Sequence, residues 1–143
     1  MSIQANMTGA RQMIERAFNG GDLNAVDELL IPSAVDHQEP AQTNFPAHLK
    51  RAITMLRTAF PDLHFEIHHM LADGDIVAFH STMTGTHLGP FQGLAPSGKA
   101  VSVRHMHFLR MEDGRGADLW HLWDTPALMK QIGAGPGREP AQI

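Results

Sequence analysis

The sequence contains no cysteine among its 143 residues. This absence excludes disulfide bonds, thiolate nucleophiles and cysteine-ligated metal centres. Runs of lysine or arginine are lacking as well, and the formal net charge is −4. Because phosphate backbones and anionic lipids attract positive charge, we expect neither nucleic acid nor a membrane as a partner.

Long apolar stretches are also absent, so no segment predicts a membrane-spanning helix. The N-terminus lacks the basic start and the apolar run of a secretory signal, which predicts a cytoplasmic protein. A chain of 143 residues is long enough for one hydrophobic core but too short for two. We expect a single domain over residues 1–133 and a flexible tail, rich in glycine and proline, over residues 134–143.

The first part of the sequence has the apolar spacing of helices. Apolar residues recur every three or four positions within Thr8–Asn19, within Leu23–Leu30 and within Leu49–Phe60. Gly20 and Gly21 follow the first of these segments, and Pro61 follows the third. Because glycine and proline stop helices at such positions, we predict three helices before Pro61.

After Pro61 the apolar residues alternate, which is typical of strands. Tight turns at Asp73-Gly74 and at residues 112–116 separate strands that should pair antiparallel. A last short helix follows Thr125-Pro126. This order predicts an α+β fold in which the N-terminal helices pack on one side of a curved, mainly antiparallel sheet. The expected strands are residues 65–71, 75–86, 100–111 and 117–124.

Histidine is abundant, with ten residues, and it titrates near neutral pH. Strand alternation places His105 and His107 on one face of their strand. On the next strand Trp120 and Asp124 share a face, whereas His121 takes the opposite one. We expect the Trp120 face and the His105 face to line one apolar cavity. There Asp124 would act as a general acid–base, because burial raises the pKa of a carboxyl group and a neighbouring imidazole can pass its proton.

Two other interpretations compete with this one. Asp124 precedes the last predicted helix, so it could instead support the cap of that helix. His105 and His107, followed by Glu112, match the first half of a cupin motif, whose ligands suit zinc, iron or manganese. The second half of that motif is missing, and the leading helices are unlike a jelly roll. We therefore expect no metal.

Four segments, in order from about Met7 to Gly133, carry a resemblance to a known family. They are Phe60-Pro-Asp-Leu, Asp73-Gly-Asp-Ile-Val-Ala, the loop from Gly85 to Lys99, and Trp120-His-Leu-Trp-Asp124 with Leu128 and Gln131-Ile-Gly133. Together they resemble the SnoaL-like polyketide cyclase and ester cyclase family of the nuclear-transport-factor-two-like superfamily. The resemblance implies a cone-shaped α+β barrel and a homodimer built through the sheet. It also implies an intramolecular aldol cyclisation that uses no metal or coenzyme.

The resemblance also assigns roles to residues. The family's catalytic aspartate falls at Asp124, and the supporting histidine of the preceding strand falls at His105 or His107. The segment Val35-Asp-His37 resembles a lining piece of the family's pocket, and His87 lies in the loop at its rim. The residues expected to contact the substrate are His37, His80, His87, Phe91 and Trp120.

The sequence departs from the family in two respects. It has no tyrosine, which some relatives use to bind a substrate oxygen. In the family, an acidic residue and a His-Trp pair frequently come just before the catalytic aspartate, whereas this chain has Asp118-Leu-Trp120-His121. We therefore expect His121 to point away from the cavity. We predict a cofactor-independent acid–base enzyme that acts on an apolar, carbonyl-bearing small molecule. The alternatives are a non-catalytic ligand-binding or dimerisation module and a relative with hydroxylase or epoxide-opening activity.

Overall fold

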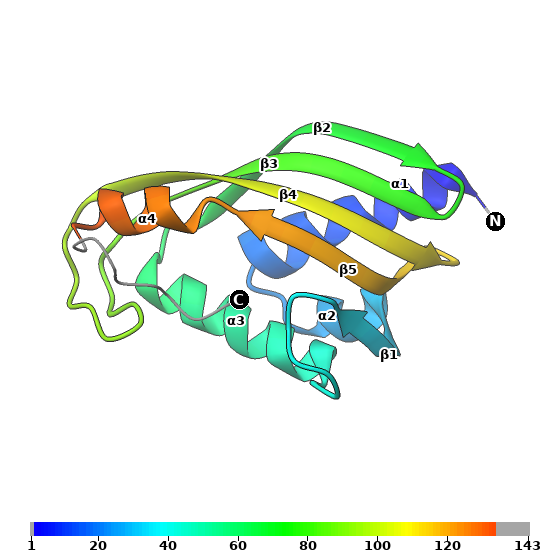
Figure 1. Ribbon diagram of the computed structural model, residues 1–143, viewed down its shortest axis with the longest axis horizontal. Helices are drawn as coiled ribbons and strands as arrows, with labels where there is room; N and C mark the ends of the chain where they lie inside the picture. Colours follow the sequence, from blue (N-terminus) through cyan, green and yellow to red (C-terminus); the bar gives the residue numbers. More distant parts are fainter. Residues whose placement is uncertain (1, 134–143) are drawn as a thin grey trace.

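The computed structural model describes residues 2–133, and the tail expected over residues 134–143 lies outside them. A five-stranded sheet curves over a layer of helices, which cover one of its faces (Figure 1). The predicted α+β class is confirmed, although the sheet does not close into a barrel, because β1 and β2 are its two unpaired edges. Within residues 2–133, no helix has the length and apolar character needed to cross a membrane.

Side chains cap the first helix and the long helix before Pro61. Ser2 and Asn44 accept hydrogen bonds from the backbone N–H groups three residues later, at Ala5 and Ala47. The first predicted helix is α1, and it continues as the π-helical segment η1. The helical segments are α1 (Ile3–Gln12), η1 (Met13–Asn19), α2 (Asn24–Leu29), α3 (Phe45–Ala59) and α4 (Thr125–Gln131).

The sheet has the order β1-β5-β4-β3-β2, and all neighbours pair antiparallel except β1, which is parallel to β5. The four predicted strands are confirmed, but β1 was not predicted. Its alternation is hidden by Pro32 and by a register irregularity between Leu30 and Val35. The strands are β1 (Leu30–Asp36), β2 (His64–Asp73), β3 (Ile76–Thr86), β4 (Ala100–Glu112) and β5 (Arg115–Trp123).

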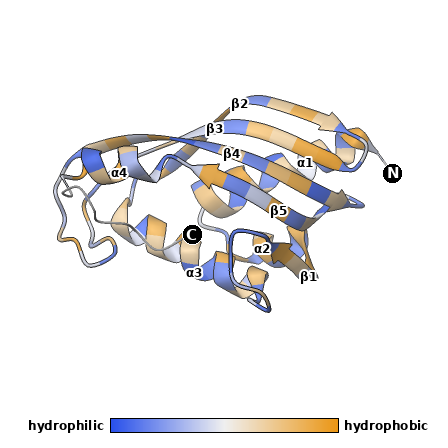
Figure 2. Ribbon diagram, in the orientation of Figure 1, coloured by the Kyte–Doolittle hydropathy of each residue, from blue (hydrophilic) through white to orange (hydrophobic). Residues whose placement is uncertain are grey.

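Hydrophobic and hydrophilic residues alternate along the strands (Figure 2). Inward-facing residues of β3 and β4, such as Val77 and Val103, are buried, as are Ile53 and Leu56 of α3. Helices and sheet therefore share one hydrophobic core. Along the inner face of β4, histidines take the place of aliphatic residues at two successive inward positions between Val103 and Leu109.

We predict that Gly9→Ala destabilises the protein, although alanine is the better helix former by about 1 kcal/mol. A Cβ atom at Gly9 would overlap the backbone oxygen of Gly114, in the turn between β4 and β5. We expect the free energy of unfolding to fall by about 1–3 kcal/mol in denaturant titrations. Thr8→Ala, at an exposed position of the same helix, is the control. A Gly9→Ala protein at least as stable as the wild type would contradict this packing.

Candidate functional site

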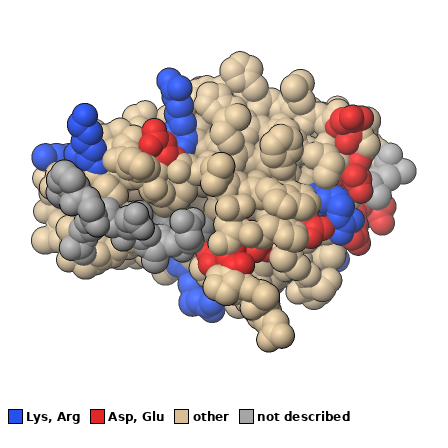
Figure 3. Space-filling model, in the orientation of Figure 1, with Lys and Arg blue, Asp and Glu red and all other residues tan. Residues whose placement is uncertain are grey.

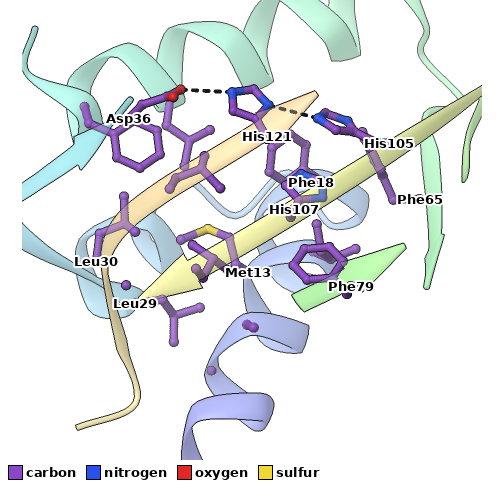
Figure 4. Close-up of a pocket in the computed structure, with 18 of the residues that line it drawn as sticks. Met13, Phe18, Leu29, Leu30, Asp36, Phe65, Phe79, His105, His107 and His121 are labelled. Atoms are coloured by element: carbon purple, nitrogen blue, oxygen red, sulfur yellow. Dashed lines mark hydrogen bonds and ion pairs between the residues drawn. The ribbon is translucent and has the colours of Figure 1, made fainter. Parts of the chain in front are cut away.

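Three histidines from two neighbouring strands lie on the inner face of the sheet. His107 of β4 is directly opposite His121 of β5, and His105 is opposite Trp123. Because opposed residues of an antiparallel pair project to the same face, all three imidazoles point toward the helices (Figure 4). Each of the three histidines is only 8% exposed.

A hydrogen-bonded chain connects two of these histidines to a buried carboxylate. His105 Nε2 lies 2.9 Å from His121 Nδ1, and His121 Nε2 lies 3.1 Å from Asp36 Oδ2 (Figure 4). Asp36 ends β1 and is 4% exposed, and its other oxygen accepts a hydrogen bond from the backbone N–H of Gln38 at 2.9 Å. The parallel pairing of β1 with β5 thus places the carboxylate beside the imidazole that it orients.

Burial keeps two of the imidazoles neutral. Desolvation, helped by His121, lowers the pKa of His105 to about 3. Desolvation also lowers the pKa of His107 well below its usual value, and His105 and His121 add to this effect. With an ionised Asp36, both hydrogen bonds form when His121 donates from Nε2 and His105 donates from its own Nε2. In that arrangement His121 accepts at Nδ1.

The cavity around this chain is largely apolar. His107 stacks on Phe79 with ring centroids 4.3 Å apart, and on His105 at 4.0 Å. The polar side chains among the lining residues are those of Asp36, the three histidines and His48, together with the indole of Trp123. The aliphatic and aromatic wall includes Met13, Ile14, Phe18, Leu49, Leu56 and Phe65. Such surroundings strengthen interactions with a polar group of a bound ligand and exclude water.

The expected position of Asp124 in this cavity is wrong. Asp124 is exposed, and its Oδ1 accepts a hydrogen bond from the backbone N–H of Ala127, so it caps α4. The capping alternative is therefore confirmed. The face of β5 expected to line the cavity is in fact the outward one, because the register with β4 directs His121 and Trp123 inward. Leu122 is directed outward and is 70% exposed.

Two residues expected to contact the substrate, His37 and Trp120, lie on the outward side of β5. Trp120 stacks on His37 outside the cavity, with ring centroids 4.6 Å apart, and His37 Nε2 lies 2.8 Å from Asp118 Oδ1. His80 lies on β3 at an outward position, next to His69. None of His37, His80 and Trp120 lines the cavity, and the expectation that the Trp120 face of β5 does so is wrong.

The remaining two expected contacts, His87 and Phe91, are buried away from the cavity. The ring of Phe60 packs against both of them, and His87 Nδ1 lies 2.9 Å from the hydroxyl oxygen of Ser97. Neither residue lines the histidine cavity. They hold the loop between β3 and β4 against the end of α3.

Of the predicted residues, His105 and His107 lie in the cavity as expected. His121 and Asp36 complete the polar chain, so the expectation that His121 points away from the cavity is wrong. The segment Val35-Asp-His37 was expected to line the pocket, and its middle residue does so. Trp123 is opposite His105, and strand alternation places His121, two residues earlier, on the same inward face. The strand register is therefore the information needed to identify His121.

One group of side chains within residues 2–133 has the donor atoms and spacing for a metal ion. One ring nitrogen from each of His105, His107 and His121 lies within 4.8 Å of the other two. Glu112, considered with the cupin motif, instead forms an ion pair with Arg110 at the far end of β4.

Comparison with known proteins agrees with the fold and identifies the family. Residues 8–132 match the family model described as SnoaL-like polyketide cyclase. Over 139 residues the chain is 28% identical to the aklanonic acid methyl ester cyclase DnrD of Streptomyces peucetius. That alignment covers 93% of this chain and 92% of DnrD.

Solved structures with similar folds cover nearly the whole chain. TsrD of Streptomyces laurentii has a TM-score of 0.85 at 25% identity, covering 94% of this chain and 99% of TsrD. AclR of Streptomyces galilaeus, named as a candidate hydroxylase, has a TM-score of 0.81 at 26% identity, covering 96% of this chain and 91% of AclR.

We predict that the buried imidazoles make stability fall as the pH drops. In the unfolded chain histidine takes up a proton near pH 6.5, whereas folded His105 resists protonation down to about pH 3. The stability due to neutral imidazoles is therefore complete above about pH 6.5 and is lost progressively below it. Urea titrations at about pH 7 and about pH 5.5 measure this loss.

His107→Leu should reduce the loss of stability between these two pH values, because it removes one buried group that takes up a proton in the unfolded state. His64→Ala, at an exposed position, is the matched control and should leave the loss as in the wild type. An equal loss in wild type and His107→Leu would contradict the assignment of His107 as a buried, neutral imidazole.

Proposed function

Because the chain belongs to the SnoaL-like polyketide cyclase family, we propose that it is a cofactor-independent acid–base enzyme acting on an apolar, carbonyl-bearing small molecule. The observation that carries this proposal is the chain from Asp36 through His121 to His105 inside an apolar cavity. A carboxylate that fixes one imidazole nitrogen leaves the other available as a proton acceptor. His121 is therefore the proposed base, and Asp36 is the residue that orients it.

The proposed reaction is an intramolecular aldol cyclisation. His121 accepts a proton from the carbon next to a carbonyl group, and the electron pair of the broken C–H bond becomes an enolate. The enolate carbon then forms a bond to a second carbonyl carbon, whose oxygen takes the proton back. No atom is gained or lost. Asp36 stabilises the protonated imidazole, and the apolar wall strengthens that interaction.

His105 and His107 have supporting roles in this proposal. His105 donates to His121 Nδ1 in the free protein, so a substrate must displace that hydrogen bond before His121 can act. His107, stacked between Phe79 and His105, holds the imidazole of His105 in place. The many apolar lining residues favour a substrate with fused or adjacent rings over a small hydrophilic one.

The first substrate to test is aklanonic acid methyl ester, because the curated relative DnrD is named as its cyclase. We expect His121→Ala to lower kcat by roughly 10² to 10⁴, and Asp36→Asn to lower kcat by a smaller factor. Asp124→Asn should retain wild-type kcat, because asparagine also caps helices well. Liquid chromatography with mass spectrometry follows a product of unchanged mass.

Circular dichroism and thermal unfolding verify that each variant is folded. Full activity of a folded His121→Ala protein would refute the assignment of the base. A wild-type protein that binds polyketide esters tightly, but turns over none of a panel of them, would favour the non-catalytic binding module.

We also propose that the protein is a homodimer built through the outer face of the sheet. Phe108 is opposite Trp120, and Met106 is opposite Leu122, so four large apolar side chains adjoin on that face. Their exposures range from 38% for Trp120 to 70% for Leu122. Figure 3 shows an uncharged area over the middle of the sheet. Apolar patches of this kind mark interaction sites.

Leu122→Glu should convert the dimer to a monomer, because it would bury a charge at the centre of the interface. Sedimentation velocity at several protein concentrations measures the change. Ile3→Glu, at an exposed apolar position of α1, is the control and should remain dimeric. A wild-type protein that sediments as a monomer at all concentrations would contradict the dimer.

A further inference from the structure

We propose that His105, His107 and His121 form a binding site for one divalent transition-metal ion, with zinc as the natural probe. One ring nitrogen of each histidine lies within 4.8 Å of the other two. Zinc–nitrogen bonds are about 2.0–2.1 Å long, so nitrogens around one ion are more than 3 Å apart. The three donors are therefore already close to the spacing that a single ion requires.

The strand geometry supplies this spacing. His105 and His107 are two residues apart on β4, and the third histidine lies directly opposite His107 on the antiparallel neighbour β5. All three side chains project from one face into one cavity. Three imidazoles on one side of an ion leave a fourth position open, and here that position faces the apolar cavity. Sites with three protein ligands and one open position are the catalytic type of zinc site.

Asp36 provides the outer partner that such sites contain. A metal-bound histidine commonly donates its second ring N–H to a carboxylate, which fixes the ring and its tautomer. His121 Nε2 lies 3.1 Å from Asp36 Oδ2, and His121 Nδ1 is the nitrogen that faces His105. The carboxylate is itself held by the backbone N–H of Gln38. The carboxylate that orients His121 is therefore in place before any ion binds.

Two further nitrogens support a ligand in the cavity. The Nδ1 atoms of His105 and His107 are buried and have no hydrogen-bond partner among residues 2–133. An unpaired buried nitrogen is costly, and an ion or a polar group of a ligand that binds to it removes this cost. When the proton of His105 moves from Nε2 to Nδ1, Nε2 becomes free to bind an ion.

Ion binding requires the rings to turn. The three imidazole planes lie within 9° to 27° of parallel and stack on one another, whereas an ion must lie in the plane of each ring that binds it. Rotation about the Cβ–Cγ bonds achieves this and breaks the hydrogen bond between His105 and His121. We therefore expect the histidine ring signals to change on binding.

A second group of histidines on the outer face provides the matched control. His69 Nδ1 lies 3.4 Å from His80 Nδ1, and the ring of His68 lies 5.2 Å from that of His80. These side chains face outward, and within residues 2–133 their hydrogen bonds run to Thr82 and to each other, not to a carboxylate like that of Asp36. Substitution of His80 therefore distinguishes adventitious surface binding from binding in the cavity.

Bound zinc would occupy His121 Nδ1, the nitrogen that accepts the proton in the proposed cyclisation. Zinc should therefore inhibit turnover, and only this consequence rests on the proposed function. The binding experiment uses no substrate, so the metal site and the proposed reaction can each fail independently.

The test is calorimetric titration of untagged, chelator-treated protein with zinc, together with visible spectra of the cobalt-loaded protein. We expect one ion per chain and the intense cobalt absorption of a four-coordinate site. His107→Ala and His121→Ala should abolish this binding, and Asp36→Asn should weaken it by roughly 10- to 100-fold. His80→Ala should bind as the wild type does.

Nuclear magnetic resonance of the wild-type protein keeps the test independent of variant folding. Zinc should shift the ring nitrogen signals of His105, His107 and His121, and leave those of His68, His69 and His80 in place. The proposal is overturned if the wild type binds no ion. It is also overturned if binding survives in folded His107→Ala, or if it is lost in His80→Ala.

Discussion

The register between β4 and β5 is the constraint on which the site depends. It places His107 opposite His121 and His105 opposite Trp123, so every polar group of the cavity except Asp36 and His48 comes from this one pair of strands. A shift by one residue would exchange the two faces of β5. The exposed Leu122 would then enter the cavity, and His121 would be lost from it.

The same register gives the two faces of the sheet different properties. The inner face holds neutral imidazoles against the helices, where burial lowers the pKa values of His105 and His107. The outer face carries exposed apolar side chains, including Phe108 and Leu122. A carboxylate on the inner face is tolerated because Asp36 is hydrogen-bonded at both oxygens. The polar chain is thus stable in a cavity from which the surrounding apolar side chains exclude water.

Much of the fold followed from sequence periodicity, because helices and alternating strands bury their apolar residues at characteristic intervals. Strand β1 was missed because Pro32 and an irregular register obscure its alternation. The positions of His105 and His107 in the cavity were predicted correctly, since both lie on one regular strand. Asp124 was misplaced because alternation defines which residues share a face, but only pairing with β4 decides which face is inside. No local pattern could connect Asp36 with His121, 85 positions away.

The proposed function depends on the hydrogen bond between Asp36 and His121, and the proton in that bond can be observed directly. Nuclear magnetic resonance of protein labelled with nitrogen-15 in histidine reports the tautomer of each ring. We predict that His121 of the metal-free protein carries its proton on Nε2, with a low-field signal that is protected from exchange and is lost in Asp36→Asn. A His121 ring protonated on Nδ1, or one whose Nε2 proton exchanges as rapidly as that of an exposed histidine, would contradict it.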